Sequence, residues 1–211
     1  WLIVNRGGEQ AAQHSQALHS LFSHIPGLKV VAPSTAYDAK GLLISAIRDP
    51  NPVVFIDDRW LYAFKDNVPE EIFEVPIGKG IIRKEGKDIT LVSFSYMAVQ
   101  SQIAANELKK EGIDIEFIDL RTIKPLDENL ILQSVKKTGR LVVVDASWKT
   151  NSITAEVAAI VVEKAFSYLR APIQRVNLPD TPAPASSSLE SAYYINKNDI
   201  INAIKQNIST Q

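Results

Sequence analysis

The chain has 211 residues, of which 45% are hydrophobic and 22% are charged, a composition typical of an ordinary globular protein. Its formal net charge of -1 excludes a strong electrostatic attraction to nucleic acid or to an anionic membrane, so we expect neither as a partner. There is no cysteine, which excludes disulfides and thiolate metal sites, and no apolar run approaches the roughly 18 residues of a membrane span.

The chain begins with an apolar run, Trp1-Leu2-Ile3-Val4, that is typical of a buried strand. There is no initiator methionine, and the run has neither the basic start nor the small-residue cleavage site of a signal peptide. We therefore expect that the first residue lies inside a domain and that the sequence is N-terminally incomplete.

Short β-rich runs alternate with longer helical patterns along the rest of the chain. The predicted strands are Leu2–Val4, Leu28–Val31, Val53–Ile56, Ile89–Phe94, Ile115–Leu120, Leu141–Val144 and Ile173–Asn177. The predicted helices are Ser15–His24, Ala36–Arg48, Tyr96–Glu111, Glu128–Lys137, Ile153–Leu169 and Asn198–Ile208. Thr35 or Asp38 is expected to cap the second helix, and Gly112 to end the third. This alternation predicts βαβ units, and therefore an α/β fold with a mostly parallel sheet.

The alternation breaks between about Ala63 and Gly80, where prolines, glycines and acidic residues gather. We interpret residues 65–80 as a linker between two domains, which then span residues 1–64 and 81–211. A second irregular stretch, Pro179 to Ser188, contains three prolines and three serines and is predicted to be a loop.

Three histidines, His14, His19 and His24, follow one another at intervals of five residues. On a helix this spacing turns each side chain by roughly 140° from the last, so they do not converge on a metal ion and we expect separate roles. His14 lies in the run Gln13-His14-Ser15-Gln16, at the predicted start of a helix, where an imidazole can serve a site. Ser15 there is equally well explained as the N-cap of that helix.

Several longer motifs, one after another along the chain, resemble those of a known family. They are Ala12-Gln13-His14-Ser15-Gln16, residues 24–31 (HIPGLKVV), Pro33-Ser34-Thr35, residues 38–43 (DAKGLL), residues 46–52 (AIRDPNP) and residues 119–127 (DLRTIKPLD). Together they resemble the beta subunit of the thiamine-diphosphate-dependent 2-oxo acid dehydrogenases, in particular the pyruvate and branched-chain enzymes. The resemblance implies the C-terminal part of a pyrimidine-binding domain, followed by a transketolase C-terminal-type α/β domain.

The resemblance implies one catalytic residue in this chain. The active-site histidine of the family belongs to the Gln-His-Ser-Gln motif, here His14, which would assist proton transfer near the cofactor. The glutamate that contacts the aminopyrimidine of thiamine diphosphate in the family falls upstream of Trp1, so no cofactor-binding residue is assigned here. Magnesium is expected mainly on the alpha subunit, which holds the diphosphate in this family.

The family also binds a structural potassium ion, mainly through main-chain oxygens. Hard oxygen ligands from irregular backbone suit such a cation. The alternative is a plain helix end closed by Pro50, which needs no ion. The matching positions in this chain are Ile3, Ala46, Ile47, Asp49 and Asn51.

The predicted function is oxidative decarboxylation of a 2-oxo acid, with transfer of the acyl group to lipoamide, by an α2β2 enzyme. We expect the alpha subunit, a second beta subunit and the lipoyl transacylase as partners, in a bacterial cytoplasm or the mitochondrial matrix. The chain alone is expected to be inactive. The alternative is a non-catalytic fragment or assembly module that docks the transacylase core. A third possibility, another thiamine enzyme such as a transketolase, lacks this Gln-His-Ser-Gln context.

The helix Ile153–Leu169 is expected to pair with the second beta subunit, because it is apolar nearly all round. In that case Ile160→Asp breaks the dimer and leaves the fold intact. The alternative is that the last helix, Asn198–Ile208, covers this surface within the chain.

Two departures from the family pattern bear on the site. The loop from Arg6-Gly7 to the motif around His14 is shorter than in the family. Asp145-Ala146-Ser147-Trp148 stands where the family usually has a turn with glutamate, glycine and tryptophan.

Overall fold

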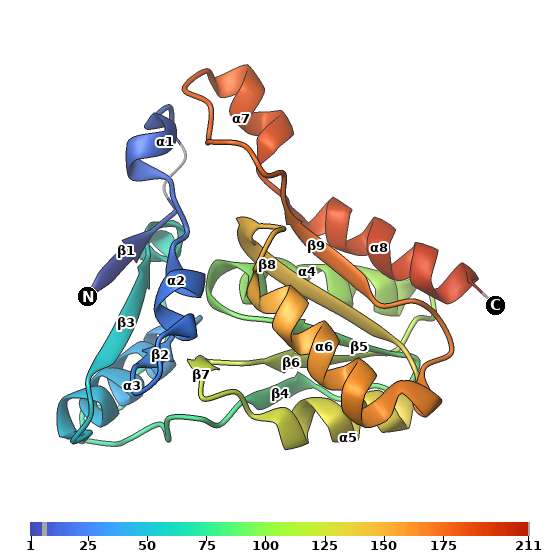
Figure 1. Ribbon diagram of the computed structural model, residues 1–211, viewed down its shortest axis with the longest axis horizontal. Helices are drawn as coiled ribbons and strands as arrows, with labels where there is room; N and C mark the ends of the chain where they lie inside the picture. The colour runs from blue at the N-terminus through green and yellow to red at the C-terminus, as the bar shows by residue number, and fades with distance from the viewer. Residues whose placement is uncertain (6–7, 211) are drawn as a thin grey trace.

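A computed structural model describes residues 1–5 and 8–210 of the chain. The short loop predicted after Arg6-Gly7 lies partly outside the described residues. The chain forms two β-sheets with helices around them, and its two termini lie on opposite sides of the molecule (Figure 1). The α/β class predicted from the sequence is confirmed.

The first sheet has four strands in the order β1-β3-β2-β7. Their bounds are β1 (Leu2–Val4), β2 (Lys29–Val31), β3 (Val53–Asp58) and β7 (Thr122–Lys124). The first three run parallel, whereas β7 runs antiparallel to β2 and reaches this sheet from beyond the predicted linker. The sequence pattern does not predict β7. This strand has only three residues, and they form a strand because they pair with β2.

The second sheet has five strands in the order β4-β6-β5-β8-β9. Their bounds are β4 (Ile81–Lys84), β5 (Ile89–Ser93), β6 (Ile115–Asp119), β8 (Leu141–Trp148) and β9 (Gln174–Leu178). All pairs are parallel except β4 with β6, so an antiparallel strand closes one edge. β4 is a further strand that the sequence pattern does not predict.

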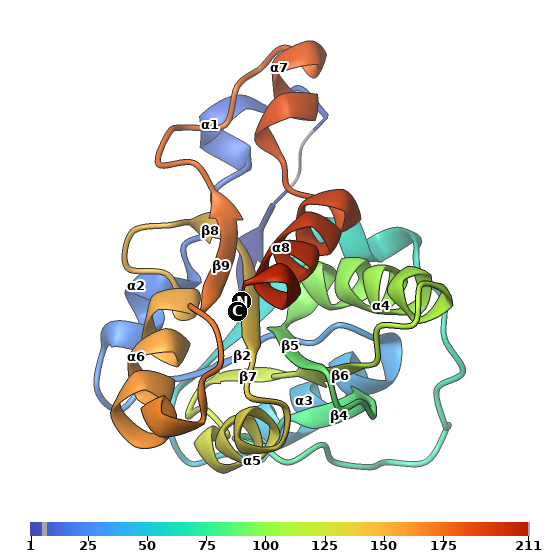
Figure 2. The same cartoon turned by 90° about the vertical axis from the view of Figure 1, so that its right-hand side faces the viewer.

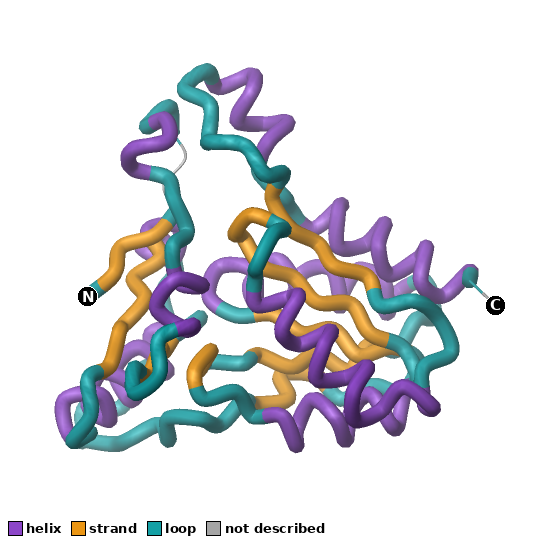
Figure 3. The backbone as a smooth tube through the Cα atoms, in the orientation of Figure 1, coloured by secondary structure: helices purple, strands orange, loops and turns teal. Residues whose placement is uncertain are grey.

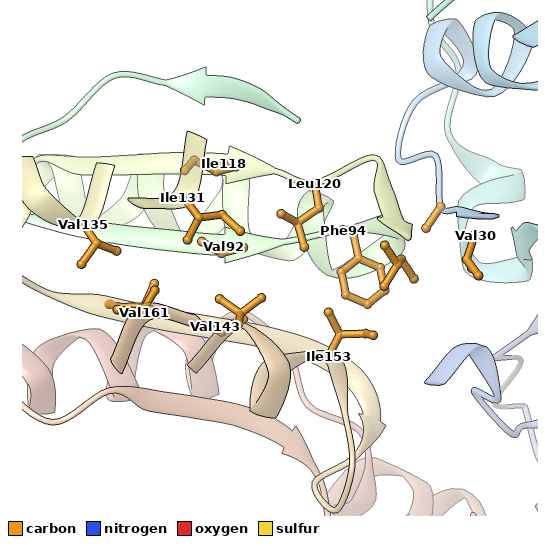
Figure 4. Packing of buried hydrophobic residues seen from close by; sticks show 14 of the residues in the cluster. Val30, Val92, Phe94, Ile118, Leu120, Ile131, Val135, Val143, Ile153 and Val161 are labelled. Atoms are coloured by element: carbon orange, nitrogen blue, oxygen red, sulfur yellow. The ribbon is translucent and has the colours of Figure 1, made fainter. Parts of the chain in front are cut away.

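Helices cover both faces of the second sheet. They are α4 (Ser95–Lys110) and α8 (Lys197–Ser209) on one face, and α5 (Glu128–Thr138) and α6 (Ile153–Ala165) on the other. Figure 4 shows the second of these layers, where Val92 and Val143 of the sheet meet Val135 and Val161 of the helices. Each such side chain, once fully buried, contributes roughly 1.5–3 kcal/mol. No helix in the described ranges is long and apolar enough to cross a membrane.

One helix, α3 (Ala36–Arg48), matches its predicted bounds. The hydroxyl of Thr35 accepts a hydrogen bond from the backbone N–H of Asp38 at 3.1 Å, so Thr35 is the cap. Pro50 follows the last turn and cannot extend the helix.

The predicted linker is held along α3. The rings of Tyr37 and Phe73 stack with centroids 4.3 Å apart, and the hydroxyl of Ser45 donates to the carbonyl of Val75 at 2.7 Å. Residues 64–80 contain no helix or strand, but these contacts fix their course over the first sheet. The domain boundaries themselves stay a prediction.

The helix predicted over residues 15–24 is wrong in its first half. Two short helices stand in its place, α1 (Ala11–His14) and α2 (His19–His24), joined by a loop (Figure 3). Residues 15–18 lie in no helix or strand. Ser15 and Ala17 of this loop are buried, as is His19 at the start of α2, and burial of every second residue is not the pattern of a helix. Ser15 therefore follows α1 as its C-cap and is not the N-cap of a helix.

Other differences lie near the ends of predicted elements. The loop predicted over Pro179–Ser188 is followed without a break by α7 (Ser187–Tyr193), which the sequence pattern does not predict. A 3-10 turn, η1 (Arg59–Ala63), follows β3. The helix predicted to end at Leu169 ends as α6 at Ala165 and continues as the 3-10 turn η2 (Phe166–Tyr168).

The prediction that Ile160→Asp breaks a dimer and leaves the fold intact is wrong, because Ile160 is buried in the fold. Ile160 is 7% exposed, so Ile160→Asp would place a charge in the fold itself. The exposed apolar residues of α6 and of the turn that follows it are Val162, Phe166 and Tyr168. The alternative cover is also wrong, because α8 packs on α4 and on the opposite face of the sheet from α6.

Candidate active site

His14 is the last residue of α1 and is exposed to solvent. The prediction that it begins a helix is therefore wrong, because α1 ends at His14 and residues 15–18 form a loop. Its carbonyl oxygen accepts a hydrogen bond from the guanidinium of Arg59, which also donates through Nε to the carbonyl of Asn5 at 3.1 Å. Arg59 thus ties the backbone of His14 to the end of β1.

α1 stands beside α7, and the two project together beyond the sheets (Figures 1 and 2). The backbone N–H of Glu9 donates to both carboxylate oxygens of Glu190, each at 3.0 Å. The carboxylate of Glu9 accepts from the backbone N–H of Ser187 at 3.3 Å, at the start of α7. These bonds connect the segment before His14 with a segment near the other end of the chain.

The carboxyl ends of β3, β5 and β8 gather at the junction of the two sheets, which is where open parallel sheets usually bind ligands. Asp58, buried at the end of β3, accepts from Asn5 Nδ2 at 3.1 Å and from Ser95 Oγ at 3.0 Å. Burial raises the pKa of Asp58, although these donors oppose the rise. Asn5 and Ser95 both have a positive φ, a strain that clusters at functional sites.

His19 and Asp145 form a second contact across this junction. Nε2 of His19 lies 3.0 Å from Oδ1 of Asp145, and both side chains are buried. The hydroxyl of Ser147 donates to the same carboxylate at 2.7 Å. Because His14 and His24 are exposed and His19 is buried, the three histidines have different surroundings. No group of three or more metal-ligating side chains occurs within residues 1–5 and 8–210.

A third contact is a buried ionic network. Arg83 of β4 donates to Asp119 through Nε at 3.1 Å and through Nη2 at 2.9 Å, and Nη2 also bonds Asp38 of α3. Arg121 donates to the other oxygen of Asp38 at 3.2 Å, and Ser34 bonds Asp119. Burial raises the pKa of Asp119, while Arg83 acts against that rise. The network fixes α3 against the second sheet.

The structure brings four of the five predicted potassium ligands together. Ala46 and Ile47 lie in the last turn of α3, and Asp49 and Asn51 follow it directly. Ile3 does not join them, because it pairs with Asp57 at the far end of β3. Asp57 is four residues along β3 from Val53, which corresponds to about 13 Å.

The carbonyl oxygens at this helix end lack their usual donors. The partner of the Ala46 carbonyl would be the backbone nitrogen of Pro50, which has no hydrogen. The partner of the Ile47 carbonyl would be Asn51, whose N–H donates instead to Oδ1 of Asp49 at 2.9 Å. Carbonyl oxygens at the negative end of a helix dipole that lack these donors suit a cation.

Two cavities lie near the junction, and His14 lines neither. One, of about 720 Å³, lies between α2, the residues around Pro125 and the start of α6. The other, of about 440 Å³, lies between β3, the start of α3 and the residues around Tyr62. His14 is exposed and lies outside both cavities.

The sequence identifies His14 only through the motif, and it assigns no catalytic role to His19, Asp145 or Asp58. His19 and Asp145 are 126 residues apart, so no spacing rule connects them. The one available signal was the departure from the family turn at Asp145-Ala146-Ser147-Trp148.

Two family models match the chain. The transketolase pyrimidine binding domain matches residues 4–65, and the transketolase C-terminal domain matches residues 78–200. The chain belongs to the transketolase family of domains. A transketolase-type pair of domains accounts for both sheets and for their parallel strands.

Curated relatives of this transketolase-type chain are named as beta subunits of a pyruvate dehydrogenase E1 component and of an acetoin oxidoreductase. The pyruvate dehydrogenase E1 component subunit beta of Rickettsia felis is 47% identical over 196 residues, covering 93% of this chain and 60% of the relative. The acetoin:2,6-dichlorophenolindophenol oxidoreductase subunit beta of Cupriavidus necator is 48% identical over 191 residues, covering 90% of this chain and 56% of the relative. The chain thus spans about 60% of the length of these relatives.

A solved structure described as a split gene transketolase, inactive beta4 tetramer, has the same fold. Its TM-score is 0.81 with 24% sequence identity, and the match covers 98% of this chain and 65% of that chain. At this identity the likeness concerns the fold alone.

Proposed function

We propose that this chain acts as the beta subunit of a thiamine-diphosphate-dependent 2-oxo acid dehydrogenase, in which His14 transfers protons at a site shared with an alpha subunit. The observation that carries the proposal is the match over more than nine-tenths of the chain to beta subunits of such complexes, at 47% identity. An exposed His14 on a segment that projects from the body agrees with a site that a second subunit completes.

In this proposal the residues of this chain and those of the alpha subunit have different roles at the shared site. Thiamine diphosphate supplies carbanion chemistry when bound, and magnesium is assigned to the alpha subunit that would hold its diphosphate. No residue of this chain is assigned to the aminopyrimidine. The part of His14 is to hold or release a proton close to the substrate, a task for which imidazole is the commonest side chain.

Replacement of His14 by alanine tests the proposal. We expect kcat of the enzyme reconstituted with its alpha subunit to fall at least about 100-fold, as is usual when a general acid or base is lost. The fold should be unaffected, because an exposed side chain changes stability by no more than about 0.5 kcal/mol. The assay follows lipoyl acylation with pyruvate, branched-chain 2-oxo acids and acetoin, the last because the Cupriavidus necator relative carries acetoin in its name.

His24→Ala is the matched control, since His24 is also exposed but belongs to no proposed site, and it should keep full activity. If the unmodified protein binds its partners yet turns over none of these substrates, the assembly-module alternative is favoured. A His14→Ala enzyme with normal kcat would remove His14 from the mechanism.

We also propose a potassium ion at the end of α3, on the carbonyl oxygens of Ala46, Ile47, Asp49 and Asn51. Potassium chloride should then raise the melting temperature more than sodium chloride at equal ionic strength, because an ion that binds the folded state stabilises it. Pro50→Ala is expected to reduce this difference, since the new N–H can bond the Ala46 carbonyl. Equal melting temperatures in the two salts would argue against the site.

The proposed second beta subunit would pack on exposed apolar residues at the C-terminal end of α6 and in the turn η2 after it. Val162 is 47% exposed and Phe166 is 69% exposed, although both are large and apolar. We expect Val162→Asp to convert a dimer into a monomer at micromolar concentration, as measured by light scattering. Leu189→Asp, on the exposed face of α7, is the control and should remain dimeric. A wild-type monomer, or a dimeric Val162→Asp variant, would refute this surface.

The lipoyl transacylase is proposed as the partner of the assembled enzyme.

A further inference from the structure

The segment that carries His14 is weakly held by its own helices. α1 has four residues and none is buried, and α2 has six residues of which only His19 is buried. Neither helix has a side-chain cap at its start. Helices this short are not stable alone, so tertiary contacts must set the position of residues 11–24. Ala17 and Phe22 make apolar contacts, but these have no fixed direction.

His19 makes a directional contact with the other domain. Its Nε2 lies 3.0 and 3.2 Å from the two oxygens of Asp145, near the end of β8. Asp145 is fully buried and also accepts from Ser147 Oγ at 2.7 Å and from the backbone N–H of Ile153 at 3.3 Å. Ser147 and Ile153 both donate to this carboxylate, and an ionised carboxylate can only accept, so we place a ring proton of His19 on Nε2.

The rest of the imidazole has no polar partner within residues 1–5 and 8–210. Its edge packs on the ring of Phe94, with centroids 5.3 Å apart, and its buried Nδ1 has no hydrogen bond. Loss of Asp145 would therefore leave His19 without any hydrogen bond in a buried place. Such a loss costs more than an exposed contact would, because a buried polar group cannot bond to water instead.

We propose that Asp145 positions the His14 segment through His19, so that a residue of the C-terminal domain orients the acid–base residue; this inference rests on the proposed role of His14. The segment is held at two points. Arg59 bonds the carbonyl of His14 from the N-terminal domain, and Asp145 holds His19 five residues later. Neither His19 nor Asp145 can touch substrate, since both are buried, so they are positioning residues and not catalytic ones.

Hydrogen exchange of the full chain measures this hold directly. In His19→Leu we expect amide exchange over residues 11–18 to accelerate at least about tenfold, while α3 and α8 exchange as in the wild type. His19→Gln keeps a donor toward Asp145 and should restore most of the protection. His24→Leu, at the exposed end of the same helix, is the control and should change nothing. If His19→Leu does not fold, Asp145→Asn carries the same comparison, because it keeps the side-chain volume but turns an amide toward the donors.

Kinetics of the enzyme reconstituted with its alpha subunit supply the second measurement. Displacement of His14 should lower kcat about 10- to 100-fold with KM for the 2-oxo acid nearly unchanged, and His19→Gln should recover most of it. Unchanged exchange over residues 11–18 in His19→Leu, or a Gln variant as defective as Leu, would overturn the inference. If the wild-type enzyme is inactive, the proposed function fails, and the exchange data still decide whether Asp145 holds the segment.

Discussion

Arg83→Met is expected to lower the free energy of unfolding by about 3–5 kcal/mol, the usual cost of removing one partner from a buried ion pair. Arg83 is the side chain that neutralises Asp119, which is fully buried, and it also reaches Asp38. Methionine keeps the length of the side chain but supplies no donor. The loss is a large part of a typical domain stability of about 5–15 kcal/mol.

Urea unfolding at pH 7 measures this loss, and Arg48→Met provides a matched control. Arg48 pairs with Glu74, but both side chains are about half exposed. An exposed pair of this kind contributes about 0–1 kcal/mol, so the control should unfold nearly as the wild type does. Equal losses in the two variants would show that the buried network does not hold the domains together.

The loss in the free energy of unfolding caused by Arg83→Met should also depend on pH. Burial raises the pKa of Asp119, and Arg83 opposes that rise, so the folded variant binds a proton to Asp119 at higher pH than the unfolded chain does. A raised pKa of this kind means that folded-state stability is lost as pH rises through it. The difference from wild type should therefore be largest near neutral pH and shrink as pH falls toward the unfolded value of about 4.

The parts of the fold that the sequence predicts well are those with local causes. α3 has a capping threonine before it and Pro50 after it, so both ends follow from the sequence. The central strand β8 begins with a continuous apolar run, Leu141–Val144, because helices cover both faces of the second sheet.

The parts that the sequence misses depend on distant partners. β7 is a strand only because β2 lies beside it. Residues 15–18 leave the predicted helix because Ser15, Ala17 and His19 are buried in alternation at the junction. The contact between His19 and Asp145 joins residues 126 positions apart. His14 was identified from a motif, whereas its dependence on Arg59 and Asp145 follows only from the folded arrangement.

Gly86→Ala is expected to destabilise the chain by more than about 4 kcal/mol, or to leave no cooperative unfolding transition, which is exceptional for one methyl group. A Cβ at Gly86 would lie 2.1 Å from the carbonyl carbon of Ile115 and 2.4 Å from the backbone nitrogen of Glu116. These are main-chain atoms at the start of β6, so no side chain can rotate away to relieve the overlap. The turn between β4 and β5 would have to leave the sheet.

Gly112→Ala separates this clash from ordinary backbone strain. Gly112 has a φ of 84°, but a Cβ there would meet no atom within 4 Å. Its replacement should cost about 1–2 kcal/mol, the usual penalty of a left-handed conformation. Circular dichroism and urea unfolding of the two variants give the comparison, and a Gly86→Ala protein within about 1 kcal/mol of wild type would contradict the close packing at β6. Because β4 carries Arg83, displacement of this turn should also release Asp119, so the defect should reach the junction that orients the His14 segment.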